Sequence, residues 1–208
     1  MRRLLPIVAL AALPWSAPLL APPAAAQPLP PKRGAPPPVP DKPARPPPRS
    51  QSLDDLFARL AAAQDETEAK GVERLIERRW ARSGSDTADL LMARAGEAIA
   101  AKELPLAIEL LDRVLALEPN WAEGWYRRAT AFHMLDDPVR ALADLQQALA
   151  REPRHFNAWA GLGHIQMASD NKRQALLAYR KALALHPHLQ RMKDVVDKLT
   201  PEIDGRDI

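Results

Sequence analysis

The sequence predicts an all-α protein built from stacked helix hairpins, and three observations support this fold class. Pro119, Pro153 and Pro187 lie 34 residues apart, and a fixed period of this length is typical of helical-hairpin repeats. Trp125 and Trp159 each follow one of these prolines by six residues, so two residue types share the period. The chain is also rich in Ala, Leu and Arg with only 5% aromatic residues, a composition that favours helices over sheets.

The first 26 residues have the pattern of a secretory signal peptide. Arg2 and Arg3 give a positive start, an apolar stretch follows, and Ala24 and Ala26 are the small residues before a cleavage site at Gln27. Prolines interrupt the apolar stretch, which argues against a membrane anchor. No later segment approaches the roughly 18 apolar residues of a spanning helix. We therefore expect an exported, soluble mature chain without a transmembrane segment.

Residues 27–50 predict a basic, proline-rich linker. Eleven of the 22 prolines lie between Pro28 and Pro48, and proline lacks the backbone donor that helices and sheets need. The composition predicts a semi-rigid spacer; contact with anionic lipid, cell wall or a proline-binding domain is the alternative. Residues 51–208 carry 22 Lys and Arg against 25 Asp and Glu. This mildly acidic remainder gives no support for nucleic-acid binding.

Residues 51–87 predict a degenerate helical hairpin or an N-terminal cap. Ser52 and Asp55 have the spacing of a capping box, which starts a helix. Apolar residues at helical spacing mark one face of each helix. These residues are Leu53, Leu56, Phe57 and Leu60 in the first helix, and Val72, Leu75, Ile76 and Trp80 in the second.

The recurring prolines divide the next part of the chain into three hairpins, residues 88–121, 122–155 and 156–189. Each proline ends a second helix, because the residue before a proline disfavours helical backbone. The tryptophan begins the packing of the next hairpin. Ala141 and Ala175 occupy equivalent positions in the second helices. Their small side chains are expected to let antiparallel helices approach closely.

The turn inside each hairpin and the end of the stack can also be identified. Lys102, Asp136 and Asp170 fall in these turns, where Asp tolerates left-handed backbone better than Lys does. Pro138 suits the first turn of a helix. Residues 190–208 predict a capping helix and tail, with an apolar stripe on one face and charged residues on the other. The stripe consists of Leu189, Met192, Val195, Val196 and Leu199.

The three units resemble the tetratricopeptide repeat (TPR) family. The second and third units each match all but one of its signature positions, the exceptions being Arg128 and Gln166. The first unit, residues 88–121, matches less well. The resemblance implies a right-handed α-solenoid with a concave groove for a peptide or partner protein, and no cofactor. The whole layout is similar to small exported TPR proteins of Gram-negative bacteria, which implies the periplasm.

The resemblance also implies which side chains face the groove. A surface of Met, Tyr and His suits a peptide or a helix, because these side chains adapt to an apolar partner. Met92 and Gly96 stand where the family's carboxylate-binding Lys and Asn would be, so that subtype is not expected. The groove residues are Met92, Tyr126, Thr130, His133, Asn157 and His164. Four of them are expected not to be needed for packing the hairpins, namely Tyr126, His133, Asn157 and His164.

The sequence shows no arrangement typical of an enzyme or a metal site. It has no cysteine, no Gly-rich phosphate loop and no HExxH pattern. His133 and His164 are expected to approach each other, but no third ligand can be identified. The predicted function is a non-catalytic periplasmic scaffold that binds a protein or peptide. An envelope or membrane-surface adaptor anchored by the linker is the alternative, and a metal protein or enzyme is the least favoured.

Overall fold

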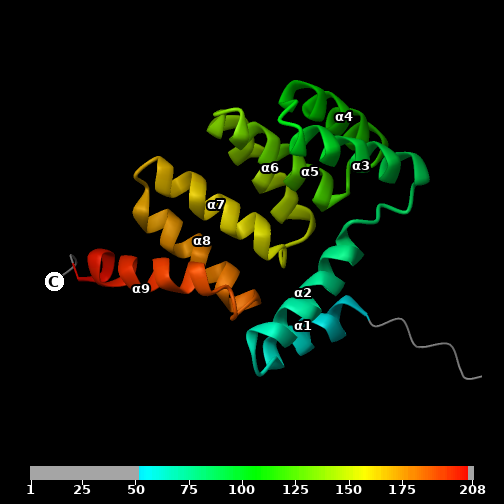
Figure 1. Ribbon diagram of the computed structural model, residues 1–208. Helices are drawn as coiled ribbons and strands as arrows, with labels where there is room; N and C mark the ends of the chain where they lie inside the picture. Colours follow the sequence, from blue (N-terminus) through cyan, green and yellow to red (C-terminus); the bar gives the residue numbers. More distant parts are fainter. Residues whose placement is uncertain (1–51, 206–208) are drawn as a thin grey trace, which may run out of the picture. The chain divides into compact units, whose positions relative to one another are not determined.

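The computed structural model describes residues 52–205, and this part of the chain consists of nine α-helices without a strand (Figure 1). The predicted all-α repeat fold is therefore confirmed. The signal segment with Ala24, Ala26 and Gln27 and the linker 27–50 lie outside the described residues. The helices are α1 (Leu53–Ala62), α2 (Glu66–Trp80), α3 (Asp86–Ala100), α4 (Leu104–Leu117), α5 (Ala122–Met134), α6 (Pro138–Arg151), α7 (Phe156–Ala168), α8 (Lys172–Leu185) and α9 (Gln190–Asp204).

Helices α3–α4, α5–α6 and α7–α8 form three consecutive hairpins, and α4 packs on α5, α6 on α7 and α9 on α8. Ala141 and Ala175 are fully buried in the second helices, as their positions in the repeat predict. Gly163 of α7 lies against the ring of Tyr179 in α8. Small residues therefore stand where the two helices of a hairpin approach most closely.

The turns inside the hairpins adopt the expected left-handed backbone. The φ angles of Lys102, Asp136 and Asp170 are 62°, 60° and 57°. Asp137 caps α6 by accepting a hydrogen bond from the Arg140 backbone N–H. In α1, Ser52 and Asp55 form the predicted capping box.

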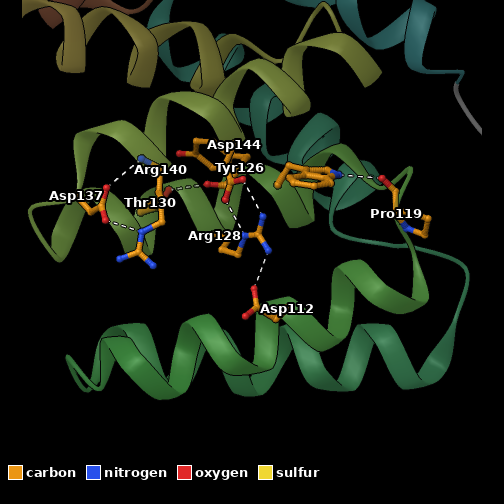
Figure 2. A network of polar contacts seen from close by, with 9 residues as sticks. Asp112, Pro119, Tyr126, Arg128, Thr130, Asp137, Arg140 and Asp144 are labelled. Atoms are coloured by element: carbon orange, nitrogen blue, oxygen red, sulfur yellow. Dashed lines mark hydrogen bonds and ion pairs between the residues drawn. The ribbon is translucent and has the colours of Figure 1, made fainter.

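The recurring proline and tryptophan are joined by a repeated hydrogen bond. Trp125 Nε1 donates to the carbonyl oxygen of Pro119 at 2.9 Å (Figure 2). Trp159 Nε1 donates to that of Pro153 at 2.9 Å. Both indoles are only partly buried. Each tryptophan thus links its own first helix, α5 or α7, to the proline that follows the second helix of the preceding hairpin. This role is more specific than the packing stripe expected from the sequence.

Arg128, one of the departures from the repeat signature, links three helices. Its guanidinium donates to both carboxylate oxygens of Asp144 in α6, at 2.7 and 2.8 Å, and to Asp112 in α4 at 2.7 Å (Figure 2). Asp144 is 5% exposed. A buried carboxylate needs such pairing to stay charged, so the departure at Arg128 is explained by an ion-pair network between the first and second repeats.

The α1–α2 hairpin packs against the turns that connect successive repeats. It does not mainly continue the stack of hairpins beyond α3. Its buried cluster includes Phe156, the first residue of α7. Trp121 Nε1 donates to the Trp80 carbonyl at 2.7 Å, and His188 Nε2 lies 3.1 Å from the Ala63 carbonyl. A solenoid repeat normally contacts only its neighbours. Here the N-terminal hairpin reaches segments that are up to 125 residues away in the sequence.

Candidate functional site

A groove of about 800 Å³ runs along the first helices α5 and α7. Helix α2 forms one wall of it, and α9 with the turn before it forms another. Most of the lining is apolar, including Ala129, Leu145, Ile165 and Met192. Concave, mainly apolar sites with a few polar groups are the usual form of ligand-binding sites in proteins.

The groove brings together five of the six residues selected from the sequence. Tyr126, Thr130 and His133 reach it from α5, and Asn157 and His164 reach it from α7. The sixth residue, Met92 of α3, does not line this groove. It is partly buried against the cluster of Ala95, Leu111 and Ala131, which come from α3, α4 and α5.

Tyr126 contributes to packing as well as to the groove, which corrects the expectation that it is free for a partner. Its ring lies 4.7 Å from the ring of buried His155, and it packs against the core that contains Ala129 and Leu145. Burial raises the pKa of Tyr126, and the charge of Glu123 adds to this effect. A substitution at Tyr126 is therefore expected to change the stability of the fold.

His133 and His164 are exposed in the groove and close enough to interact electrostatically. Burial lowers the pKa of His164, and the charge of His133 lowers it further. His164 Nδ1 is hydrogen-bonded to the Tyr179 hydroxyl at 2.8 Å. Within residues 52–205, no group of three or more His, Cys, Asp or Glu is arranged to hold a metal ion.

Asn157 forms a hydrogen bond with α2, the helix that is one wall of the groove. Its Nδ2 donates to Glu77 Oε1 at 3.1 Å. Burial raises the pKa of Glu77; the Asn157 hydrogen bond opposes this effect, while the charges of Glu73 and Glu123 reinforce it. The repeat positions do not predict this wall, because α2 lies outside the three repeats.

A buried carboxylate with two side-chain partners lies behind this wall. His155 is fully buried, and its Nε2 lies 3.1 Å from Glu123 Oε2. Burial raises the pKa of Glu123, but hydrogen bonds and charges from His155 and Arg127 outweigh burial, so that the net direction is downward. Arg127 completes the pair, with Nε 2.6 Å from Glu123 Oε1. The carboxylate is thus held charged beneath the groove.

Two of the charged side chains that line the groove form an ion pair, and a third lies close to a histidine. Lys70 lies 2.7 Å from Glu66 on α2, and Glu73 lies 3.4 Å from His186. The groove can therefore hold apolar side chains and donate or accept hydrogen bonds. None of the helices in the described part of the chain has the length and apolar character needed to cross a bilayer.

Comparisons with known proteins also find proteins with tetratricopeptide repeats. A TPR repeat-containing protein of Rhizobium etli is 35% identical over 155 residues, covering 74% of this chain and 76% of the relative. Small glutamine-rich tetratricopeptide repeat-containing protein 2 of Mycosarcoma maydis is 30% identical over 106 residues, which is 51% of this chain and 30% of that protein. No protein-family model matches the chain.

Two solved structures share the fold. The first TPR of Spaghetti (RPAP3), bound to an HSP90 peptide, has a TM-score of 0.55 at 19% identity and covers 58% of this chain and 95% of that structure. The MamA protein has a TM-score of 0.53 at 20% identity, covering 74% of this chain and 82% of that structure. At this level of identity, the likeness concerns the fold alone.

Proposed function

Because the chain belongs to the tetratricopeptide repeat family, as its 35% identity to the Rhizobium etli protein over most of both chains establishes, we propose that it is a non-catalytic interaction module. Its groove between α5, α7, α2 and α9 holds a peptide or a segment of a partner protein. The observation that carries this proposal is the convergence of Tyr126, Thr130, His133, Asn157 and His164 on one mainly apolar groove.

The lining favours a segment with apolar side chains and hydrogen-bonding groups over a strongly charged one. The ion pair of Lys70 with Glu66 neutralises two of the charges on this wall. Related folds have been solved with peptides, for example the first TPR of Spaghetti with an HSP90 peptide. Met92 and Gly96 stand where the carboxylate-binding Lys and Asn of related proteins would be, which supports a ligand other than a clamped C-terminal carboxylate.

We propose further that this module works in the periplasm after removal of residues 1–26. The proposal rests on the Ala24-x-Ala26 pattern before Gln27. Protein recovered from a periplasmic fraction should have the intact mass of residues 27–208. Full-length chain that stays in the cytoplasm would contradict the proposal.

The basic linker favours a second candidate, an adaptor at the envelope or membrane surface. Residues 27–50 contain five Lys and Arg and a single acidic residue, Asp41. Screening by salt weakens contacts between exposed charges. Pelleting with envelope fractions that disappears at high salt would support this candidate, and pelleting that is independent of the linker would exclude it.

The groove is tested by capture of partners from an envelope extract with the mature chain as bait. His133→Ala is the preferred variant, because His133 is exposed in the groove. A groove contact of ordinary strength predicts affinity at least about tenfold lower, which corresponds to about 1.4 kcal/mol, with an unchanged melting temperature. Arg113→Ala is the matched control, since Arg113 pairs with Glu109 on the surface of α4.

If Arg113→Ala removes binding while His133→Ala does not, the partner uses the outer face, and the groove proposal is wrong.

A further inference from the structure

The α1–α2 hairpin covers a surface that we call the turn face, formed where the repeats join. Helix α2 places its apolar row, Val72, Ile76 and Trp80, in one buried cluster with Phe156. The Trp80 ring stacks on the His155 ring with centroids 4.3 Å apart and lies 5.1 Å from the Phe156 ring. The turn face consists of Trp121, Arg154, His155, Phe156, Asn157, His186 and His188.

Acidic side chains of the hairpin meet cationic or donor groups of the turn face. Asp54 of α1 lies 2.5 Å from Arg154. Glu73 of α2 lies 3.4 Å from His186, and Glu77 accepts a hydrogen bond from Asn157. The turn face therefore recognises a helix with an aromatic anchor and acidic residues at nearby turns.

The docked hairpin leaves polar groups unsatisfied at this contact. Trp80 Nε1 and both ring nitrogens of His186 are buried without a hydrogen-bond partner among the described residues. Such atoms destabilise the state that buries them. The charge of Glu123 on α5 also raises the pKa of Glu77, in addition to burial, which is the larger cause. The burial of Trp80 Nε1 and the repulsion between Glu77 and Glu123 are relieved when α2 moves away.

We propose that the turn face is a docking surface for an acidic amphipathic helix of a partner, and that α2 occupies it in cis. The proposal rests on the proposed function of the groove, because α2 is also one wall of that groove. A partner helix with the chemistry of α2 replaces it and thereby opens the groove on that side. The connector between α2 and α3 contains Gly84 at φ +92°, a conformation that glycine adopts easily.

The test supplies the hairpin in trans. A fluorescent synthetic peptide of residues 52–82 is titrated with the mature protein and with its Trp80→Ala variant. Removing the cis anchor should vacate the turn face, so the variant should bind the peptide at least tenfold more tightly than the unmodified protein. A peptide that carries Trp80→Ala should lose this binding. Equal binding of the peptide by both proteins would overturn the proposal.

A second variant decides the case if Trp80→Ala does not fold. Asp54→Arg places a positive charge beside Arg154, and the Asp54 side chain is 84% exposed, so the core is unaffected. This protein should bind the unmodified peptide at least threefold more tightly than the native protein does. Glu109→Arg is the matched control, because it disrupts an exposed pair with Arg113 on α4. An increase in both variants, or in neither, would contradict the proposal.

Hydrogen exchange of the Asp54→Arg protein gives an independent measurement. Amides of α2 should exchange faster than in the native protein, while amides of α5 to α8 stay protected. Loss of protection throughout the chain would identify the hairpin as a fixed part of the fold and reject its release. Neither measurement uses a groove ligand, so failure here is distinct from a failure of the His133→Ala test.

Discussion

Replacing Gly163 by alanine tests the closest contact in the repeat stack. A Cβ atom at Gly163 would lie 2.3 Å from Tyr179 Cε1, 2.5 Å from Cδ1 and 2.8 Å from Cζ. Tyr179 is 2% exposed, and its hydroxyl is bonded to His164. The rigid ring therefore cannot move away without disturbing the α7–α8 contact.

The expected magnitude is the difference between two opposing effects. Alanine in a helix interior is about 1 kcal/mol more favourable than glycine. Overpacking a close-packed contact costs about 1–3 kcal/mol, and a contact of 2.3 Å with a buried ring lies at the upper end of that range. Gly163→Ala should therefore lose about 1–2 kcal/mol of stability, which lowers the melting temperature by about 2–8 °C.

Gly71→Ala and Gly96→Ala are the matched controls, because a Cβ at either helical glycine meets nothing within 4 Å. Both should be more stable than the native protein by about 0.5–1 kcal/mol. Urea and thermal unfolding followed by circular dichroism measure all three variants. The packing argument fails if Gly163→Ala is as stable as Gly96→Ala. Tyr179→Leu combined with Gly163→Ala should recover part of the loss, since the smaller side chain leaves space.

Three further predictions concern packing and charge. Ala141→Leu should destabilise the protein by about 1–3 kcal/mol in urea unfolding, because Ala141 is fully buried; a neutral effect would contradict the repeat register. Burial raises the pKa of Glu77 in the folded state above its ordinary value of 4.5. The protonated carboxyl group therefore contributes to stability below pH 4.5, and this contribution is lost as the pH rises through the folded-state pKa. Glu77→Gln should therefore raise the melting temperature at pH 7 but not near pH 4, and an equal effect at both would refute this. Burial and His133 lower the pKa of His164 below 6.5, so stability from this site should fall as the pH drops through the folded pKa; an NMR titration midpoint at or above 6.5 would be contrary evidence.

The groove residues show how far a repeat register can predict a site. Positions counted from the prolines place Tyr126, His133 and His164 at one groove, because successive repeats present equivalent residues on the same side. Met92 does not line this groove and packs against a cluster with members from α3, α4 and α5. Tyr126 lines the groove and also contacts His155, a contact that its position in the repeat does not reveal. The role of these residues in binding a partner stays a prediction.

The sequence by itself determined the local features of this protein. Helix ends, turn conformations and small residues at helix crossings depend on neighbours within one repeat, so the proline period and positions such as Asp136 and Ala141 predict them. Only the tertiary structure decided where the α1–α2 hairpin lies. An apolar face on α2 indicates that it is covered, but the covering residues His155 and Phe156 are separated from Trp80 by two repeats. The position of the α1–α2 hairpin depends on the contact surfaces of the whole stack, which no local pattern in the sequence encodes.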